Sequence, residues 1–232
     1  LLDGADLGLG MLSLLPHPEE ERSLIMRTVG PIWDANETWL VIAAGTLFGA
    51  FPEAYAVILN ALYIPVMLML FGLILRAASF EFHAYSDNKR RWSRLFGFGS
   101  LLAVAGQGAA LGGILSGIPV AAHMFAGTAF GWATPLTLLV TLGIVMGYAV
   151  VGYAYLLKKT AQEFHGETFR RVLFFAVGTV SVLVAATLLL HEQNYLFFTR
   201  WEEGIARPIL ITVALLIGLL ALFLGYLVIA GK

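Results

Sequence analysis

The sequence predicts an all-α polytopic membrane protein. Of its 232 residues, 59% are hydrophobic and only 12% are charged, whereas globular proteins carry about 25% charged residues. The mean hydropathy is +0.83. The apolar residues form long continuous runs instead of the alternating pattern of a barrel strand. Helices are therefore the expected spanning elements, because a helix satisfies its own backbone hydrogen bonds in lipid.

Seven apolar stretches are candidates for the roughly 20-residue helix that crosses a bilayer core. The first, Leu1–Leu15, is too short, and we interpret it as a truncated span. The second is 39–51 and must begin near Trp33, because Pro52–Glu53 turns the chain after it. The remaining stretches are 54–79, 95–116, 135–157, 172–190 and 208–230.

The basic residues predict the orientation of these spans. Twelve of the 14 Lys and Arg fall after the odd-numbered spans, and only Arg200 and Arg207 fall on the other side. Cytoplasmic connections carry an excess of Lys and Arg. We therefore expect the odd spans to end in the cytoplasm.

Several classes of function are excluded or disfavoured. The formal charge is −1 and no basic stripe is present, so a nucleic-acid partner is not expected. The chain has no Cys, which excludes disulfides and thiolate metal ligands. All five His lie in loops or at span ends, so this chain is not expected to ligate a haem, which needs an axial ligand. They are His17, His83, His123, His165 and His191.

Two acids lie within the first apolar stretch. Asp3 and Asp6 are three residues apart and share one face of a helix. A proton relay is one interpretation. The alternatives are that residues before Leu1 bring these acids nearer an interface, or that they hydrogen-bond to neighbouring helices.

A second polar group precedes the apolar run that starts at Leu40. Asp34 and Glu37 have the spacing of a capping box, and polar groups at the mouth of a span also suggest a proton or ion entrance. The two interpretations are compatible, because a capping carboxylate can still pass on a proton. Trp33 and Trp39 are most simply interfacial anchors.

Arg76 lies near the inner end of the third span, five residues before Glu81. The simplest expectation is that Arg76 extends its side chain to the membrane interface. The alternatives are a buried carboxylate partner, or a lipid or quinone headgroup.

Several of these segments together resemble subunit II of cytochrome bd-type quinol oxidases, including the cyanide-insensitive branch. The resemblance is dense over residues 1–83 and looser afterwards, where Gly113–Gly117 carries it. The segments are Leu2–Gly10, Glu20–Arg22, Gly30–Leu40, Phe48–Pro52, and Arg76 ahead of Phe80–Phe82.

The resemblance implies a fold of eight spans in two four-helix bundles, of which seven are visible here. The first bundle would be 1–118, and the second, 119–232, would lack its last helix. It also implies a partner, subunit I, that carries haem b and haem d (or b-type haems) and the quinol-oxidising loop. Small single-helix subunits, lipid, quinol and a structural quinone are further expected partners of the complex, and this chain would bind no haem.

Site residues follow from the same resemblance. Asp34 matches the family's proton-uptake acid, with Glu37 and Glu81 as further proton-uptake candidates. Trp39, with Trp33, matches the region of oxygen access. Arg76, Asp3 and Asp6 are expected at a polar interface or quinone headgroup.

Two other functions remain open from the sequence. A secondary transporter with a proton-coupled carboxylate site suits repeated spans and acids within them, although the polar groups here lie mostly at the cytoplasmic span ends. A purely structural scaffold is the third. The expected function is a non-haem subunit that supports assembly and gives protons and oxygen access to the haems of subunit I.

Overall fold

The computed structural model describes residues 3–15, 19–30, 33–159 and 167–193, and over these residues the chain is all-α apart from one short hairpin. The helices are α1 (Gly4–Leu12), α2 (Glu19–Val29), α3 (Trp33–Ala50), α4 (Pro52–Ala61), α5 (Tyr63–Tyr85), α6 (Lys89–Leu115), α7 (Pro135–Lys159) and α8 (Glu167–Gln193). The strands β1 (Val120–Ala121) and β2 (Met124–Phe125) pair antiparallel.

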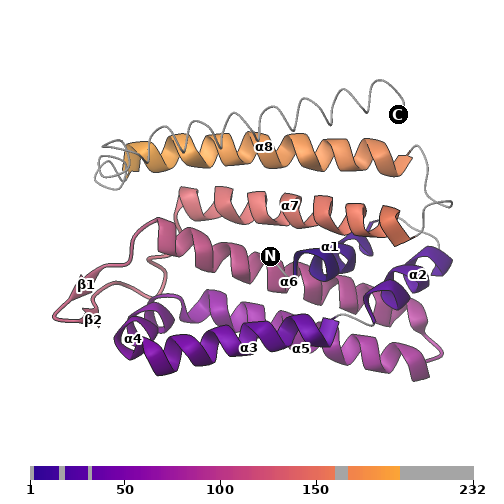
Figure 1. Cartoon of the computed structure of the whole chain (residues 1–232), viewed down its shortest axis with the longest axis horizontal. Helices are drawn as coiled ribbons and strands as arrows, with labels where there is room; N and C mark the ends of the chain where they lie inside the picture. The colour runs from indigo at the N-terminus through magenta and orange to yellow at the C-terminus, as the bar shows by residue number, and fades with distance from the viewer. Residues whose placement is uncertain (1–2, 16–18, 31–32, 160–166, 194–232) are drawn as a thin grey trace.

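The four long helices α5, α6, α7 and α8 lie side by side in chain order (Figure 1), each in contact with the next. All four are long and apolar enough to cross a membrane. The short helix α1 packs against both α6 and α7, and α3 contacts α5 through the ion pair of Glu37 with Arg76. The hairpin lies beside α4 at one end of the row, and α2 lies at the other. The chain is thus a polytopic membrane protein, as its composition predicted.

The spans predicted from the sequence agree with the helices in part. The fourth, fifth and sixth correspond to α6, α7 and α8. The second corresponds to α3, which does begin at Trp33, although only Glu37–Ala50 forms its apolar part. The seventh, 208–230, lies outside the described residues. The division into two bundles at residue 118 stays a prediction.

The third predicted span was wrong as a single helix. It is divided at Leu62, whose φ of −111° and ψ of 22° are not helical. Pro65 explains the break, because its ring has no N–H and clashes with the carbonyl four residues earlier. That carbonyl belongs to Ala61, the last residue of α4. Beyond the break, α5 continues to Tyr85, past the predicted end at residue 79.

Helix α2 was not predicted, since residues 16–32 read as a polar connection. Its Ile25, Met26 and Val29 are buried and pack in one cluster with Leu9 of α1 and Phe96 of α6. The helix therefore covers the ends of α1 and α6 with a narrow apolar face.

Glycines allow the central helices to approach closely. A Cβ at Gly99 of α6 would lie 2.8 Å from the backbone nitrogen of Arg76 and from the carbonyl oxygen of Gly72, both on α5. A Cβ at Gly152 of α7 would lie 2.6 Å from backbone atoms of Gly8 and Leu9 on α1. Small residues at helix contacts are the usual means of packing helices in membranes. These contacts set α5 against α6 and α1 against α7, and α5 and α1 are the helices that carry Arg76 and Asp6.

Candidate functional site

The candidate site is a buried ionic cluster formed by Asp6 of α1, Glu37 of α3 and Arg76 of α5. Both terminal nitrogens of Arg76 lie 3.4 Å from Oδ2 of Asp6. Its Nη1 also donates to Oε1 of Glu37 at 3.1 Å. Arg76 is 1% exposed and Asp6 is fully buried, whereas Glu37 retains 24% exposure. Glu37 is therefore the member of the cluster that faces outward.

The surrounding helices hold Arg76 in place. Its backbone lies against α6 at Gly99, and its guanidinium carbon lies 5.4 Å from the centre of the Phe96 ring, also on α6. A guanidinium over an aromatic face is attracted by the ring quadrupole. Oδ1 of Asp6 accepts a hydrogen bond of 2.7 Å from the backbone N–H of Leu7. The arginine and its inner carboxylate thus each have a second fixed contact.

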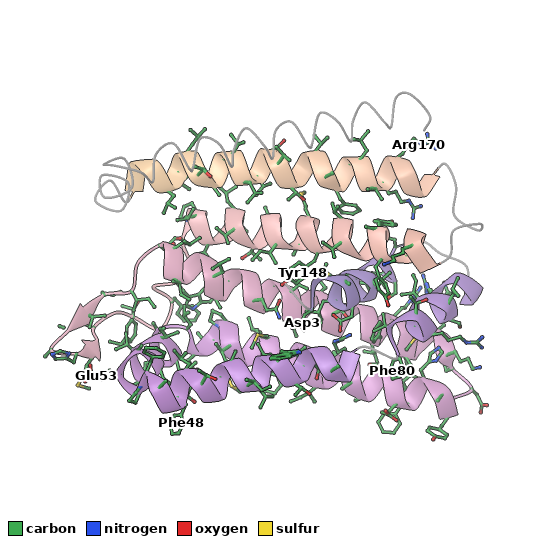
Figure 2. All side chains as sticks on the ribbon, viewed as in Figure 1. Asp3, Phe48, Glu53, Phe80, Tyr148 and Arg170 are labelled. Atoms are coloured by element: carbon green, nitrogen blue, oxygen red, sulfur yellow. The ribbon has the colours of Figure 1, made fainter. Side chains whose placement is uncertain are left out.

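A second polar pair lies between α1 and α6. Nε2 of Gln107 on α6 donates to Oδ2 of Asp3 at 3.4 Å, and Asp3 is buried. Figure 2 places Asp3 near Tyr148 of α7, in the middle of the helix row. Along α6, Gln107 is eight residues beyond Gly99, which is about 12 Å at the helical rise. The ionic cluster and the Asp3–Gln107 pair are thus arranged in a line of polar side chains, which runs from Glu37 through Arg76 and Asp6 to Asp3.

Three carboxyl groups, those of Asp3, Asp6 and Glu37, lie near Arg76 in the described part of the chain. Asp6 and Glu37 bond to its guanidinium, and Asp3 bonds to Gln107. A carboxyl group can take up and release a proton, which is the chemistry that a relay requires.

The expectation that Arg76 reaches the membrane interface was wrong. The side chain is buried and paired with two carboxylates, one 70 and one 39 residues away in the sequence. A carboxylate next to a buried guanidinium offsets its desolvation, so pairing replaces exposure. The buried-carboxylate alternative describes the structure. For Asp3 and Asp6, the structure shows the hydrogen bonds to neighbouring helices that the sequence left open.

The other predicted site residues are placed differently. Trp33 and Asp34 lie in the first turn of α3, and their side chains fall outside the described residues. Asp34 precedes Glu37 by three residues, so the two occupy neighbouring positions on one helix face. Trp39 is 57% exposed. Glu81 is exposed as well and is not part of the ionic cluster.

Gln107 and Phe96 were not among the candidate site residues predicted from the sequence, although both contact members of the site. A glutamine inside an apolar, glycine-rich helix is the one signal that could have placed Gln107 in the site. Nothing distinguishes Phe96 from the other 15 Phe in the sequence. In the part of the chain that the structure describes, no three His, Cys, Asp or Glu side chains gather as metal ligands.

Comparison with known proteins decides the family. The family model described as cytochrome bd terminal oxidase subunit II matches residues 1–232. The chain belongs to this family. It is therefore a subunit of a terminal oxidase, and the resemblance noted in the sequence is confirmed.

Individual relatives agree with the family. The chain is 30% identical over 228 residues to cytochrome bd ubiquinol oxidase subunit 2 of Bacillus subtilis (strain 168), which covers 96% of this chain and 67% of that protein. It is 30% identical over 176 residues to cytochrome bd-I ubiquinol oxidase subunit 2 of Escherichia coli (strain K12), covering 72% and 46%. A probable cytochrome oxidase subunit 2 of Haemophilus influenzae is 29% identical over 195 residues, covering 80% and 51%.

The chain thus matches between about half and two thirds of the length of these relatives. Membership in a subunit II family favours the oxidase interpretation over the transporter. The buried ionic cluster therefore lies in a subunit of a membrane oxidoreductase.

Proposed function

We propose that this chain is the non-haem subunit of a quinol oxidase complex that reduces oxygen to water in a bacterial cytoplasmic membrane. Its partner would be a haem-bearing subunit I, and small single-helix subunits and a structural quinone would complete the complex. The names of the relatives support this proposal, since they are subunits 2 of ubiquinol oxidases. The chain would stabilise the complex and give protons and oxygen access to the haems.

The ion pair between Arg76 and Glu37 carries the proton part of the proposal. Glu37 of α3 retains 24% exposure, and Asp6 of α1 is fully buried. Arg76 pairs with both and so links the partly exposed acid to the buried one. Carboxyl groups within a span usually belong to ion or proton pathways. A proton taken up at Asp34 would pass to Glu37, and from there along Asp6 toward Asp3.

The arrangement favours carboxylates over a quinone as the partners of Arg76. Both terminal nitrogens of Arg76 are within hydrogen-bond distance of carboxylate oxygens. Glu81 would act outside this line, as an exposed acid near the end of α5. Trp39, which is 57% exposed, would contribute with Trp33 to oxygen access along the face of α3.

The test is oxygen consumption by the purified complex carrying Asp34→Asn. Asparagine keeps the size and the capping ability of aspartate but cannot titrate. We expect normal haem content and a turnover lower on the order of a hundredfold, at the lower end of what a positioned acid or base contributes. Asp87→Asn is the matched control, because Asp87 is an exposed acid in the turn before α6.

A haem-replete Asp34→Asn complex with wild-type turnover would remove Asp34 from the proton pathway and leave it a helix cap. An equal loss in Asp87→Asn would indicate a general effect of surface charge. Absence of a haem-bearing partner from the purified complex would contradict the subunit assignment itself.

A further inference from the structure

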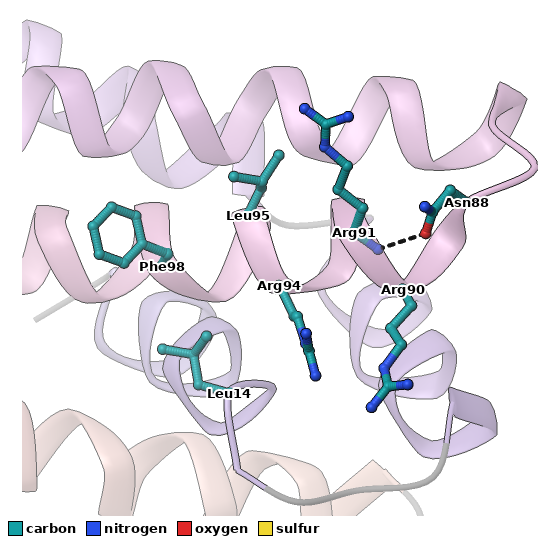
Figure 3. Close-up of a pocket in the computed structure, with 7 residues that line it drawn as sticks. All are labelled: Leu14, Asn88, Arg90, Arg91, Arg94, Leu95 and Phe98. Atoms are coloured by element: carbon teal, nitrogen blue, oxygen red, sulfur yellow. Dashed lines mark hydrogen bonds between the residues drawn. The ribbon is translucent and has the colours of Figure 1, made fainter.

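A groove at the start of α6 combines arginine and apolar side chains and is separate from the ionic cluster. Its volume is about 800 Å³, and it is lined by Leu14, Asn88, Arg90, Arg91, Arg94, Leu95 and Phe98. Figure 3 shows Arg90 and Arg94 extending from α6 on the side where Leu14 lies, with Arg91 on the opposite side of the helix. None of the lining residues is acidic.

The two arginines form a clamp with a fixed spacing. Arg90 and Arg94 are four residues apart, so they occupy neighbouring positions on one helix face. Both are exposed. Within the described residues, no ion pair joins either guanidinium to a carboxylate. Planar guanidinium groups suit bidentate binding of phosphate oxygens.

The character of the groove changes along the helix. Phe98 lies four residues beyond Arg94, about 6 Å further along the axis, and it is 52% exposed. Gly97 between them leaves room for α1, since a Cβ there would lie 2.6 Å from Oγ of Ser13 and 2.8 Å from Leu14. Positive charge at the helix start and apolar surface one turn deeper match a phosphate headgroup above an acyl chain.

The position in the membrane agrees with this match. The apolar part of α6 begins near Leu95, so the arginines stand at the level where lipid headgroups lie. Basic pockets between helices on the cytoplasmic side bind anionic headgroups. The start of a helix also carries partial positive charge, which adds to that of the arginines. Its backbone is already capped by Asn88, whose Oδ1 accepts from the N–H of Arg91 at 3.2 Å.

We propose that this groove binds an anionic phospholipid, with the phosphate held by Arg90 and Arg94 and an acyl chain lying along Leu95, Phe98 and Leu14. The site is independent of proton transfer. It would fix the end of α6 that packs against α1 and α2, and so would make the stability of the complex depend on acidic lipid.

The purified complex is delipidated and placed in phosphatidylcholine nanodiscs with phosphatidylglycerol. Native mass spectrometry then measures how much phosphatidylglycerol stays bound to the complex. The variant Arg90→Gln/Arg94→Gln should bind phosphatidylglycerol at least about tenfold more weakly, since each basic residue near the surface contributes on the order of 1 kcal/mol. Lys158→Gln/Arg170→Gln removes two exposed charges from the corresponding ends of α7 and α8 (Figures 1 and 2) and should bind as the wild type does.

A second variant tests the geometry of the clamp. Arg90→Lys/Arg94→Lys keeps both charges but loses the planar fork, so its affinity should fall between wild type and the glutamine variant. Millimolar inorganic phosphate should not displace phosphatidylglycerol. Free phosphate can contact the arginines, but it has no acyl chain to pack against the apolar part of the groove.

Four results would overturn the proposal. The first is an equal loss in the Lys158/Arg170 control, which would show general surface electrostatics. The second is wild-type affinity in the lysine variant. The third is displacement of the lipid by free phosphate. The fourth is a glutamine variant that melts early regardless of lipid, which would make the arginines partners of other residues in the protein.

Discussion

The helices in the centre of the molecule and those at its periphery differ in what they bury. Helices α1, α5, α6 and α7 bury large apolar side chains such as Phe96 and Leu136, and among them polar residues such as Asp6 and Arg76. Among the described residues of α3, α4 and α8, only Ala61 and Ala186 are buried, and large apolar side chains such as Phe48 at 63% and Phe174 at 67% are exposed. Figure 2 shows Phe48 projecting away from the molecule, while Asp3 lies inside it.

The interior is apolar as in a soluble protein, but soluble proteins rarely expose such large apolar surfaces. In a membrane chain, lipid or a partner subunit can cover the apolar surface, so hydrophobicity alone does not indicate burial. The polar residues mark the protein interior instead, because they need partners that lipid does not supply. Three variants test the contrast between the two regions.

The largest effect is expected from Arg76→Ala. It removes the guanidinium that pairs with Asp6 and Glu37 and leaves both carboxylates without their counter-charge. Breaking a buried pair in this way costs about 3–5 kcal/mol. We expect little assembled complex, measured as haem-replete complex recovered from membranes.

Arg27→Ala is the matched control, since Arg27 is exposed on α2, and it should assemble normally. If Arg76→Ala assembled as well as this control, the cluster would not hold the central helices together. The triple variant Arg76→Met/Asp6→Asn/Glu37→Gln should recover part of the assembly, because the guanidinium and the two carboxylates that pair with it are then removed together.

An intermediate effect is expected from Gly99→Ala at the contact of α5 with α6. The added Cβ would lie 2.8 Å from backbone atoms of Arg76 and Gly72, which cannot rotate away. Overpacking of this kind costs about 1–3 kcal/mol. The measurement is the thermal denaturation of the purified complex in detergent.

Gly45→Ala on α3 is the comparison, because a Cβ at Gly45 meets no atom of the described residues within 4 Å. Alanine favours a helix over glycine by about 1 kcal/mol, so this variant should be neutral or slightly stabilised. Equal destabilisation at Gly45 and Gly99 would remove the distinction between central and peripheral helices.

The smallest effect is expected from Glu53→Gln at the end of the molecule that carries the hairpin. Oε2 of Glu53 lies 3.6 Å from Nδ1 of His123, and both side chains are more than 80% exposed. Exposed ion pairs contribute less than about 1 kcal/mol. Denaturation temperature and turnover should both stay at the wild-type value, and a clear drop in either would show that this pair is covered in the complex.

The sequence predicted the long helices well, because twenty continuous apolar residues have few alternatives to a membrane helix. The prediction of 135–157 lies within two residues of α7. The sequence-based predictions failed elsewhere, where a proline or a few buried apolar residues changed the local structure. Pro65 divides the third span at Leu62, and the buried residues Ile25, Met26 and Val29 turn a polar connection into helix α2. The spacing of those three residues could have indicated a helix.

The cluster itself was predicted only as separate residues. Asp3, Asp6, Glu37 and Arg76 each stood out as polar groups in apolar surroundings. Their pairing depends on how α1, α3 and α5 pack; glycine contacts set α5 against α6 and α1 against α7. No local pattern connects Arg76 with a residue 70 positions earlier, so the sequence could not choose between an exposed arginine and a paired one.

The most direct test of proton transfer through this cluster is the turnover of a complex carrying Glu37→Gln. Nη1 of Arg76 donates to Oε1 of Glu37 at 3.1 Å. Glutamine can still accept this hydrogen bond, but its side chain cannot take up and release a proton. We expect normal assembly and haem content, with oxygen consumption lower on the order of a hundredfold and unchanged in Glu53→Gln. Wild-type oxygen consumption by a haem-replete Glu37→Gln complex would contradict a proton pathway through Glu37 and leave the cluster a structural ion pair.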